Sequence, residues 1–175
     1  MIAKTTNSKF VDVRLAQSDP TDLNGFPLVK DGQATFVPFD IFPTEDTPLP
    51  KGKSGWVIML DELSSCAKAV QAAAYKIILD RMVGQHKLHP KVRILAAGNL
   101  ETDNAHVLKM STALGSRMIH FQLKVDHGEW MNWAENNGIL TSITSFLEFQ
   151  KRALHLFDPK KIENTFPCPR KMCAS

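Results

Sequence analysis

The pattern of apolar and polar residues predicts four short β-strands. Residues 10–15 (FVDVRL) alternate apolar and polar side chains, which is the period of a strand with one buried face. Residues 56–60 (WVIML) and 92–97 (VRILAA) are unbroken apolar runs, typical of parallel strands that are buried on both faces. A fourth run, residues 119–123 (IHFQL), follows Arg117 and Met118 directly.

Helix-forming segments lie between and after these strands. The predicted helices span residues 64–82, 105–114, 128–136 and 142–157. Ser64 or Ser65 would cap the first helix and Gly84 would stop it, while Asp126 would cap the third. Strands that alternate with helices favour a parallel sheet with right-handed crossovers, so the expected fold class is α/β.

A segment rich in proline and glycine separates the first two strands. Residues 18–53 contain the prolines and glycines Pro20, Gly25, Pro27, Gly32, Pro38, Pro43, Pro48, Pro50 and Gly52. Such spacing predicts surface loops with a short strand or a helical turn, because long regular elements tolerate neither residue well. Loops of this length commonly serve a function.

Composition excludes several classes of protein. With 43% hydrophobic residues the chain can bury a core, and a net charge of +3 is far from the dense basic surface that favours nucleic acid, so no nucleic-acid partner is expected. The cysteines Cys66, Cys168 and Cys173 are odd in number and lack a second ligand pair, which favours a reducing cytoplasm over disulfides or zinc. No apolar run approaches the roughly 20 residues of a membrane span. We therefore expect a soluble cytoplasmic protein.

Polar residues end two of the predicted buried strands. Asp61 and Glu62 follow the run WVIML, and Asn99 follows VRILAA and Gly98. Where strands end at the carboxyl edge of an open α/β sheet, an acid can hold Mg²⁺ and a neighbouring glutamate can polarise water for attack on a γ-phosphate. A strand-end Asn can contact both that water and the phosphate. Arg117, which lies just before the fourth predicted strand, can stabilise the negative charge that develops during phosphoryl transfer.

The order of these motifs resembles that of the MoxR-like AAA+ ATPases, especially those encoded near phage or prophage genes. The resemblance covers most of the chain, from about Val11 to Lys171, and is carried by the segments LAQSDPTDLNGFP, WVIMLDEL, GQHKLHPKVRILAAGN, ALGSRMIHF, EWMNWAENNGI and FPCPRK. It implies a P-loop NTPase-like three-layer sandwich with a mostly parallel sheet. Residues 1–125 would form a partial AAA+ core, and residues 126–175 a helical segment that begins the C-terminal lid.

The resemblance also implies roles for individual residues. Asp61 and Glu62 would be the Walker B acids, with Asp61 binding Mg²⁺ through water and Glu62 activating the attacking water. Asn99 would be sensor 1, Arg117 the arginine finger, and Arg170 in the Pro-Arg step sensor 2, in contact with bound ATP.

One expected motif does not match. A Walker A loop, G-x-x-x-x-G-K-[ST], should precede the first strand, and the ten residues before Val11 do not fit it. The fragment Gly52-Lys53-Ser54 lacks the first glycine, since Thr47 stands there, and it enters a strand where a phosphate loop needs a helix start, so we interpret it as a simple loop. We expect weak or absent binding of ATP and Mg²⁺ by this chain alone, a missing first core strand, and a fragment, a truncated gene or a domain completed by another chain.

The resemblance implies partners as well. Further AAA+ protomers would form a homo-oligomeric ring, as a hexamer, in the cytoplasm of a bacterium or a phage-infected host. The ring would remodel or activate a partner protein, for example one of von Willebrand factor A type, with residues 25–53 as a substrate-facing loop. The alternative is a non-catalytic assembly or regulatory module that derives from such an ATPase and does not hydrolyse ATP. His86 and His89 are predicted to be turn residues and not metal ligands.

Overall fold

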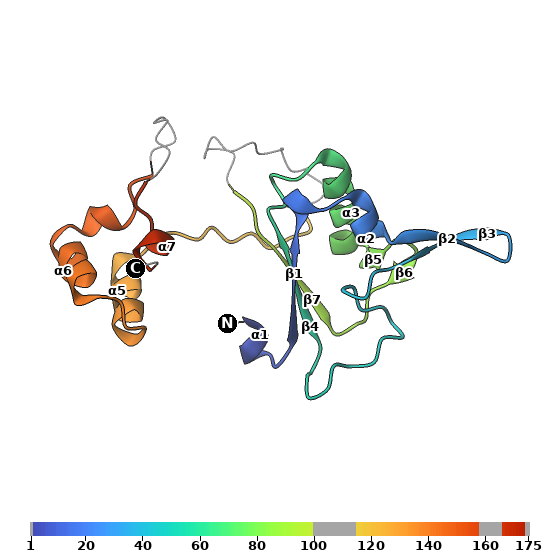
Figure 1. Cartoon of the computed structure of the whole chain (residues 1–175), viewed down its shortest axis with the longest axis horizontal. Helices are drawn as coiled ribbons and strands as arrows, with labels where there is room; N and C mark the ends of the chain where they lie inside the picture. Colours follow the sequence, from blue (N-terminus) through green and yellow to red (C-terminus); the bar gives the residue numbers. More distant parts are fainter. Residues whose placement is uncertain (1, 100–114, 158–165, 174–175) are drawn as a thin grey trace. The chain divides into compact units, whose positions relative to one another are not determined.

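The structure is a computed structural model that describes residues 2–99, 115–157 and 166–173. The chain divides into two units, Met1–Met118 and Ile119–Ser175, which are described separately below. Figure 1 shows the course of the chain and the labels of its elements. The first unit begins with a short helix, α1 (Ile2–Thr5).

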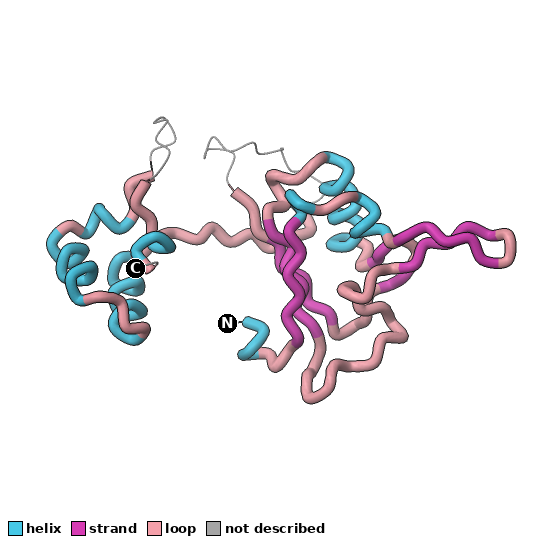
Figure 2. The backbone as a smooth tube through the Cα atoms, viewed as in Figure 1, coloured by secondary structure: helices cyan, strands magenta, loops and turns pink. Residues whose placement is uncertain are grey.

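A three-stranded parallel sheet forms the centre of the first unit. Its strands are β1 (Lys9–Arg14), β4 (Trp56–Asp61) and β7 (Val92–Ala96), in the order β1-β4-β7. Both pairings are parallel, so the carboxyl ends of the three strands lie at one edge (Figure 2). The strands predicted from the first three apolar runs are confirmed, and β4, the most apolar of them, occupies the middle of the sheet.

Helix α3 (Lys68–Leu79) packs on this sheet but is shorter than predicted at both ends. Ala67 takes the N-cap position of this helix. Ser64 lies in the preceding turn, and its hydroxyl does not cap the helix but accepts a hydrogen bond from the Asn99 amide in the turn that follows β7. After the helix, Arg81 adopts a positive φ of 56° and the chain enters a small hairpin of β5 (Met82–Val83) and β6 (His86–Lys87). Gly84 therefore belongs to the turn of that hairpin and does not stop the helix.

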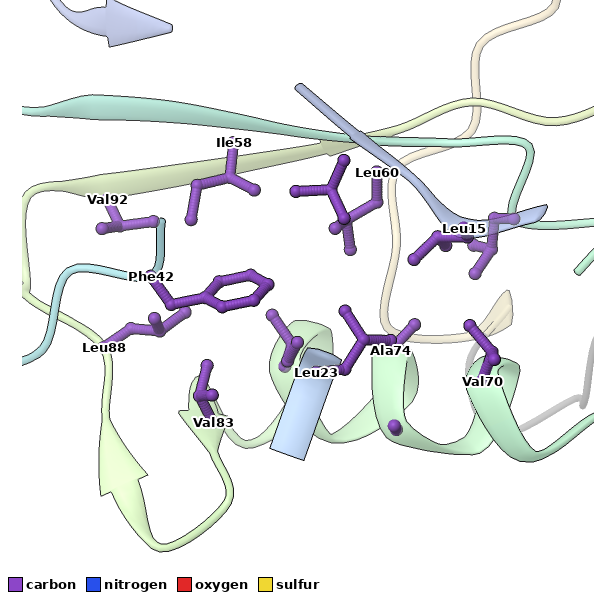
Figure 3. Packing of buried hydrophobic residues seen from close by; sticks show 14 of the residues in the cluster. Leu15, Leu23, Phe42, Ile58, Leu60, Val70, Ala74, Val83, Leu88 and Val92 are labelled. Atoms are coloured by element: carbon purple, nitrogen blue, oxygen red, sulfur yellow. The ribbon is translucent and has the colours of Figure 1, made fainter. Parts of the chain in front are cut away.

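The core of the first unit lies between the sheet, α3 and the segments that close around them. Figure 3 shows buried side chains from all of these elements meeting at close range: Leu15, Leu23, Phe42, Ile58, Leu60, Val70, Ala74, Val83, Leu88 and Val92. Full burial of one such aliphatic side chain contributes roughly 1.5–3 kcal/mol. The most apolar strand, β4, lies in the middle of the sheet, and the buried side chains of α3 pack in the same core.

The segment rich in proline and glycine contains more regular structure than its composition predicts. After η1 (Leu15–Gln17), helix α2 (Pro20–Asn24) begins at Asp19, whose carboxylate accepts from the Thr21 amide in a capping box. An antiparallel hairpin follows, formed by β2 (Phe26–Lys30) and β3 (Gln33–Val37). Its turn, Asp31-Gly32, has φ values of 51° and 76°, as a type I′ turn requires.

The fourth predicted strand is wrong. Residues 119–123 form no regular element and belong to no sheet, and Ile119, Phe121 and Leu123 are 83%, 84% and 95% exposed. A strand needs a neighbouring strand to satisfy its backbone groups, and among the described residues none pairs with this segment. The predicted helix 105–114 lies outside the described residues.

The second unit is a small group of helices. They are α5 (His127–Asn136), α6 (Thr141–Phe149), the 3₁₀ helix η3 (Lys151–Leu154) and α7 (Pro169–Met172). Asp126 caps α5 by accepting from the Glu129 amide at 2.8 Å, as predicted. The helix predicted to reach residue 157 ends at Phe149. The buried side chains are Trp130, Ala134, Leu147 and Leu154.

Candidate functional site

The acidic pair lies where β4 ends. Asp61 is the last residue of the strand and is half-buried, while the following Glu62 is exposed. One oxygen of the Asp61 carboxylate, Oδ1, accepts a hydrogen bond of 2.9 Å from the Glu62 amide. Glu62 has a φ of 60°, a left-handed conformation that costs a residue with a side chain about 1–2 kcal/mol. Backbone strain of this kind is concentrated at functional sites, and here it lies at the start of the turn that follows β4.

Hydrogen bonds join the turn after β4 to the turn after β7. The amide of Leu63 donates to the carbonyl of Ala97 at 2.9 Å, and the amide of Ala97 donates to the carbonyl of Leu60 at 2.9 Å. The amide of Asn99 donates to the hydroxyl oxygen of Ser64 at 2.8 Å. Two of these bonds hold the two turns against each other, and the bond to Leu60 joins the turn after β7 to the end of β4. Together they bring Asn99 beside the turn that carries the acidic pair.

Gly98 makes this close approach of the two turns possible. A Cβ at this position would lie 2.7 Å from the hydroxyl oxygen of Ser64 and 3.2 Å from its backbone nitrogen. Any side chain would push the turns apart. The sequence pattern predicts a helix cap for Ser64 and no role for Gly98, so it reveals neither contact. The sequence signal that could have identified them is a glycine directly before the polar residue that ends a buried strand.

The two predicted arginines, Arg117 and Arg170, lie in different units of the chain. Arg117 is exposed in a turn of the first unit, and the next residue, Met118, packs against the core of that unit. Arg170 is exposed in α7 of the second unit, whereas the acidic pair belongs to the first. Of the five residues predicted from the sequence, the structure brings together Asp61, Glu62 and Asn99.

The chemistry of this edge suits a hard cation with an incomplete set of protein ligands. Within the described residues neither Asp61 nor Glu62 forms an ion pair, and the Glu62 amide donates to only one oxygen, Oδ1, of the Asp61 carboxylate. Mg²⁺ in nucleotide sites takes one or two carboxylates and completes its octahedron with water and phosphate oxygens. The described residues contain no group of three or more His, Cys, Asp or Glu that could enclose a metal ion. The residues present therefore fit Mg²⁺ bound with a phosphate ligand.

The fragment Gly52-Lys53-Ser54 lies at the other end of β4. Gly52 has a φ of 70°, the Lys53 amide donates to Pro50, and the Ser54 amide donates to Asn7, after which the chain enters the strand. No helix begins there, so these amides do not form a phosphate cradle. The interpretation of this fragment as a simple loop is confirmed.

A pocket of about 430 Å³ opens beside β1. Its lining residues are Asp12, Val13, Arg14, Gln17, Ser18, Asp22, Phe39, Asp40 and Ile41. None of the residues predicted to form the site lines it. Arg14 and Asp12 form an ion pair of 3.8 Å with both side chains about half exposed, so this pair contributes little to stability.

Comparison with known proteins identifies the fold. No family model and no curated protein matches the chain. A solved structure from Cytophaga hutchinsonii, described as a "putative ATPase", is similar with a TM-score of 0.53 and 17% sequence identity. The match covers 80% of this chain and 41% of that protein, so the chain spans less than half the length of its structural neighbour. The chain thus shares its mixed α/β fold, with a parallel three-stranded sheet, with that protein. Among the described residues, no helix is long and apolar enough to cross a membrane.

Proposed function

We propose that this chain is part of an ATP-hydrolysing AAA+ subunit of the MoxR-like, phage or prophage type. The observation that carries the proposal is the pair of hydrogen-bonded turns that place Asp61 and Glu62 beside Asn99 at the carboxyl edge of a parallel sheet. In open α/β sheets, ligands bind at this edge. The fold shared with a protein described as a "putative ATPase" supports the same class.

In this proposal each residue has one task. The carboxylate of Asp61 holds Mg²⁺ through water, and the metal neutralises charge on the phosphates of bound ATP. Glu62 orients and polarises the water that attacks the γ-phosphate, and its exposed side chain leaves room for that water. The Asn99 side chain contacts water and phosphate, while its backbone amide is held by Ser64. Because metal binding, water activation and phosphate contact are divided between the two turns, the turns must keep a fixed separation.

The arginines extend the site to other copies of the chain. Arg117 is exposed next to a residue anchored in the core, so it can reach the nucleotide of a neighbouring protomer in a ring, which we propose to be a hexamer. Arg170, on α7 of the second unit, is the candidate for contact with ATP from the lid side. Both cations would stabilise the charge that develops as the phosphoryl group is transferred.

The partner protein would be contacted by the segment between β1 and β4. The β2–β3 hairpin exposes Phe26, Leu28 and Val29 from one strand and Phe36 and Val37 from the other. An exposed apolar surface of this kind is typical of a protein-binding site. We propose that it binds the protein that the ring remodels or activates, with a von Willebrand factor A type protein as the first candidate.

The substitution Glu62→Gln tests the catalytic assignment. It is made in a polypeptide that joins this chain to a phosphate-binding loop, with Glu45→Gln as the control on an exposed glutamate outside the site. Hydrolysis should fall by about 10²–10⁴-fold while ATP binding persists, because the amide cannot accept a proton from water. Undiminished turnover would refute the role of Glu62.

The same polypeptide distinguishes the proposed ATPase from the alternative, a non-catalytic assembly module. A non-catalytic assembly module would show no nucleotide response when titrated with a fluorescent ATP analogue, and it would still associate stably with an intact ATPase subunit. A nucleotide response that disappears on removal of Mg²⁺ supports the ATPase.

A further inference from the structure

The β2–β3 hairpin needs support from the rest of the first unit. It is a two-stranded sheet by itself, and its apolar side chains are exposed on both strands. Two-stranded hairpins without further packing are marginally stable in water. Figure 1 shows the hairpin extending from the body of the unit, with the β5–β6 hairpin near its base. Contacts at that base therefore decide how firmly the hairpin is held.

The turn between β5 and β6 touches the base of the hairpin. A side chain at Gly84 would collide with the carbonyl oxygen of Asn24 and would lie 3.5 Å from the Cβ of Phe36. Gly84 also has a positive φ of 56°, so both space and backbone conformation require glycine. Two residues further on, the Nε2 atom of His86 lies 2.8 Å from the carbonyl oxygen of Phe36.

The carbonyl group of Phe36 lies on the outer edge of β3. Phe36 stands opposite Pro27, three pairs from the pair that flanks the Asp31-Gly32 turn. In an antiparallel ladder, bonded and non-bonded pairs alternate from a two-residue turn, and this alternation turns the Phe36 carbonyl away from β2. The oxygen can only accept, so Nε2 of His86 must carry the hydrogen. His86 thus donates to a backbone group that the ladder leaves open.

The turn that holds the hairpin is itself fixed to the elements on either side of it. The ammonium group of Lys76 on α3 donates to the carbonyl of Gly84 at 2.5 Å. The guanidinium group of Arg81 donates to the carbonyls of His89 and Val92 at 3.3 Å and 2.8 Å, which ties the same hairpin to the start of β7. The support of the β2–β3 hairpin therefore lies between α3, which follows the acidic pair, and β7, which leads to the Asn99 turn.

We infer that His86 is a positioning residue that fixes the β2–β3 hairpin on the β5–β6 turn. The inference rests on the proposed function for its biological meaning, since the hairpin is the proposed contact with the partner protein. The geometry itself does not depend on ATP. With the hairpin held by α3 and β7, its apolar surface keeps one orientation relative to the acidic pair of the same unit.

Hydrogen exchange on the whole chain tests this inference without nucleotide. The His86→Ala substitution should make the amides of residues 26–37 exchange roughly 2- to 10-fold faster, the factor expected for one hydrogen bond. Lys87→Ala is the matched control, because Lys87 is the exposed neighbour on the same strand and contributes a backbone carbonyl that alanine retains. Exchange in the control should equal that of the unaltered chain.

A conservative variant and a spectroscopic signature separate positioning from general packing. His86→Gln keeps a side-chain amide donor and should restore most of the protection, and the ¹⁵N spectrum of His86 should show hydrogen on Nε2. Equal exchange in His86→Ala and Lys87→Ala, no restoration by glutamine, or hydrogen on Nδ1 alone would each overturn the inference. Hydrolysis by the Glu62→Gln variant reports on the proposed function and is independent of these results.

Discussion

The hydrogen bond between the Asn99 amide and the Ser64 hydroxyl should be the most sensitive link in the candidate site. Ser64 is 7% exposed, and its oxygen lies 2.8 Å from the amide nitrogen in a partly buried position. Ser64→Ala removes the acceptor without adding volume. The amide of Asn99 then has no partner in the turn after β4, and one of the two bonds between the turns is lost.

The expected loss of stability follows from that bond. Leaving a partly buried donor without an acceptor costs about 1–2 kcal/mol. For a unit of this size each kcal/mol lowers the melting temperature by roughly 4 °C. Ser65→Ala is the matched control, because this neighbouring hydroxyl is half-buried and forms no hydrogen bond within the described residues. The control should stay within about 0.5 kcal/mol of the unaltered chain.

The assay must report on the first unit alone. Trp56 starts the central strand and is 4% exposed, so its fluorescence follows unfolding of the sheet. Replacing Trp130 and Trp133 with phenylalanine removes the signal of the second unit. If Ser64→Ala and Ser65→Ala melt at the same temperature, the bond does not hold the turns together and the argument for a preformed site fails.

Three further predictions concern strain, thiol reactivity and pH. Glu62→Gly should stabilise the first unit by about 0.5–1 kcal/mol in urea unfolding, because glycine adopts the positive φ without strain; a lower midpoint would contradict the strain. Burial raises the pKa of the Cys66 thiol, so alkylation at neutral pH should modify Cys168 and Cys173 first, and equal rates would contradict this order. Hydrogen bonds from the backbone and side chain of Thr21 lower the pKa of Asp19. The stabilisation of α2 by this carboxylate should therefore be present above the unfolded-state pKa and lost as pH falls through the lower folded-state value. Asp19→Asn, an N-cap without a charge, should abolish this acid dependence in circular dichroism, and a persisting dependence would contradict it.

Local patterns in the sequence predict much of the first unit. Apolar runs identify β1, β4 and β7, and their parallel arrangement follows from the helix between the last two strands. Because parallel strands end at one edge, the order of the motifs also predicts that Asp61 and Asn99 lie at the same edge. The β2–β3 hairpin is equally local, since Asp31-Gly32 is a strong turn signal, but the density of proline around it concealed the strands.

Other features depend on contacts between residues that are distant in the sequence. Ser64 has the chemistry of a helix cap, yet it binds the amide of Asn99, and only the packing of two turns decides between these partners. Residues 119–123 have the alternation of a strand, yet no neighbouring strand pairs with them among the described residues. The sequence by itself determined which segments are apolar and where the chain can turn, because these are properties of near neighbours. Which donor meets which acceptor was decided by the tertiary structure, since hydrogen bonds form only between groups that folding brings within about 3 Å.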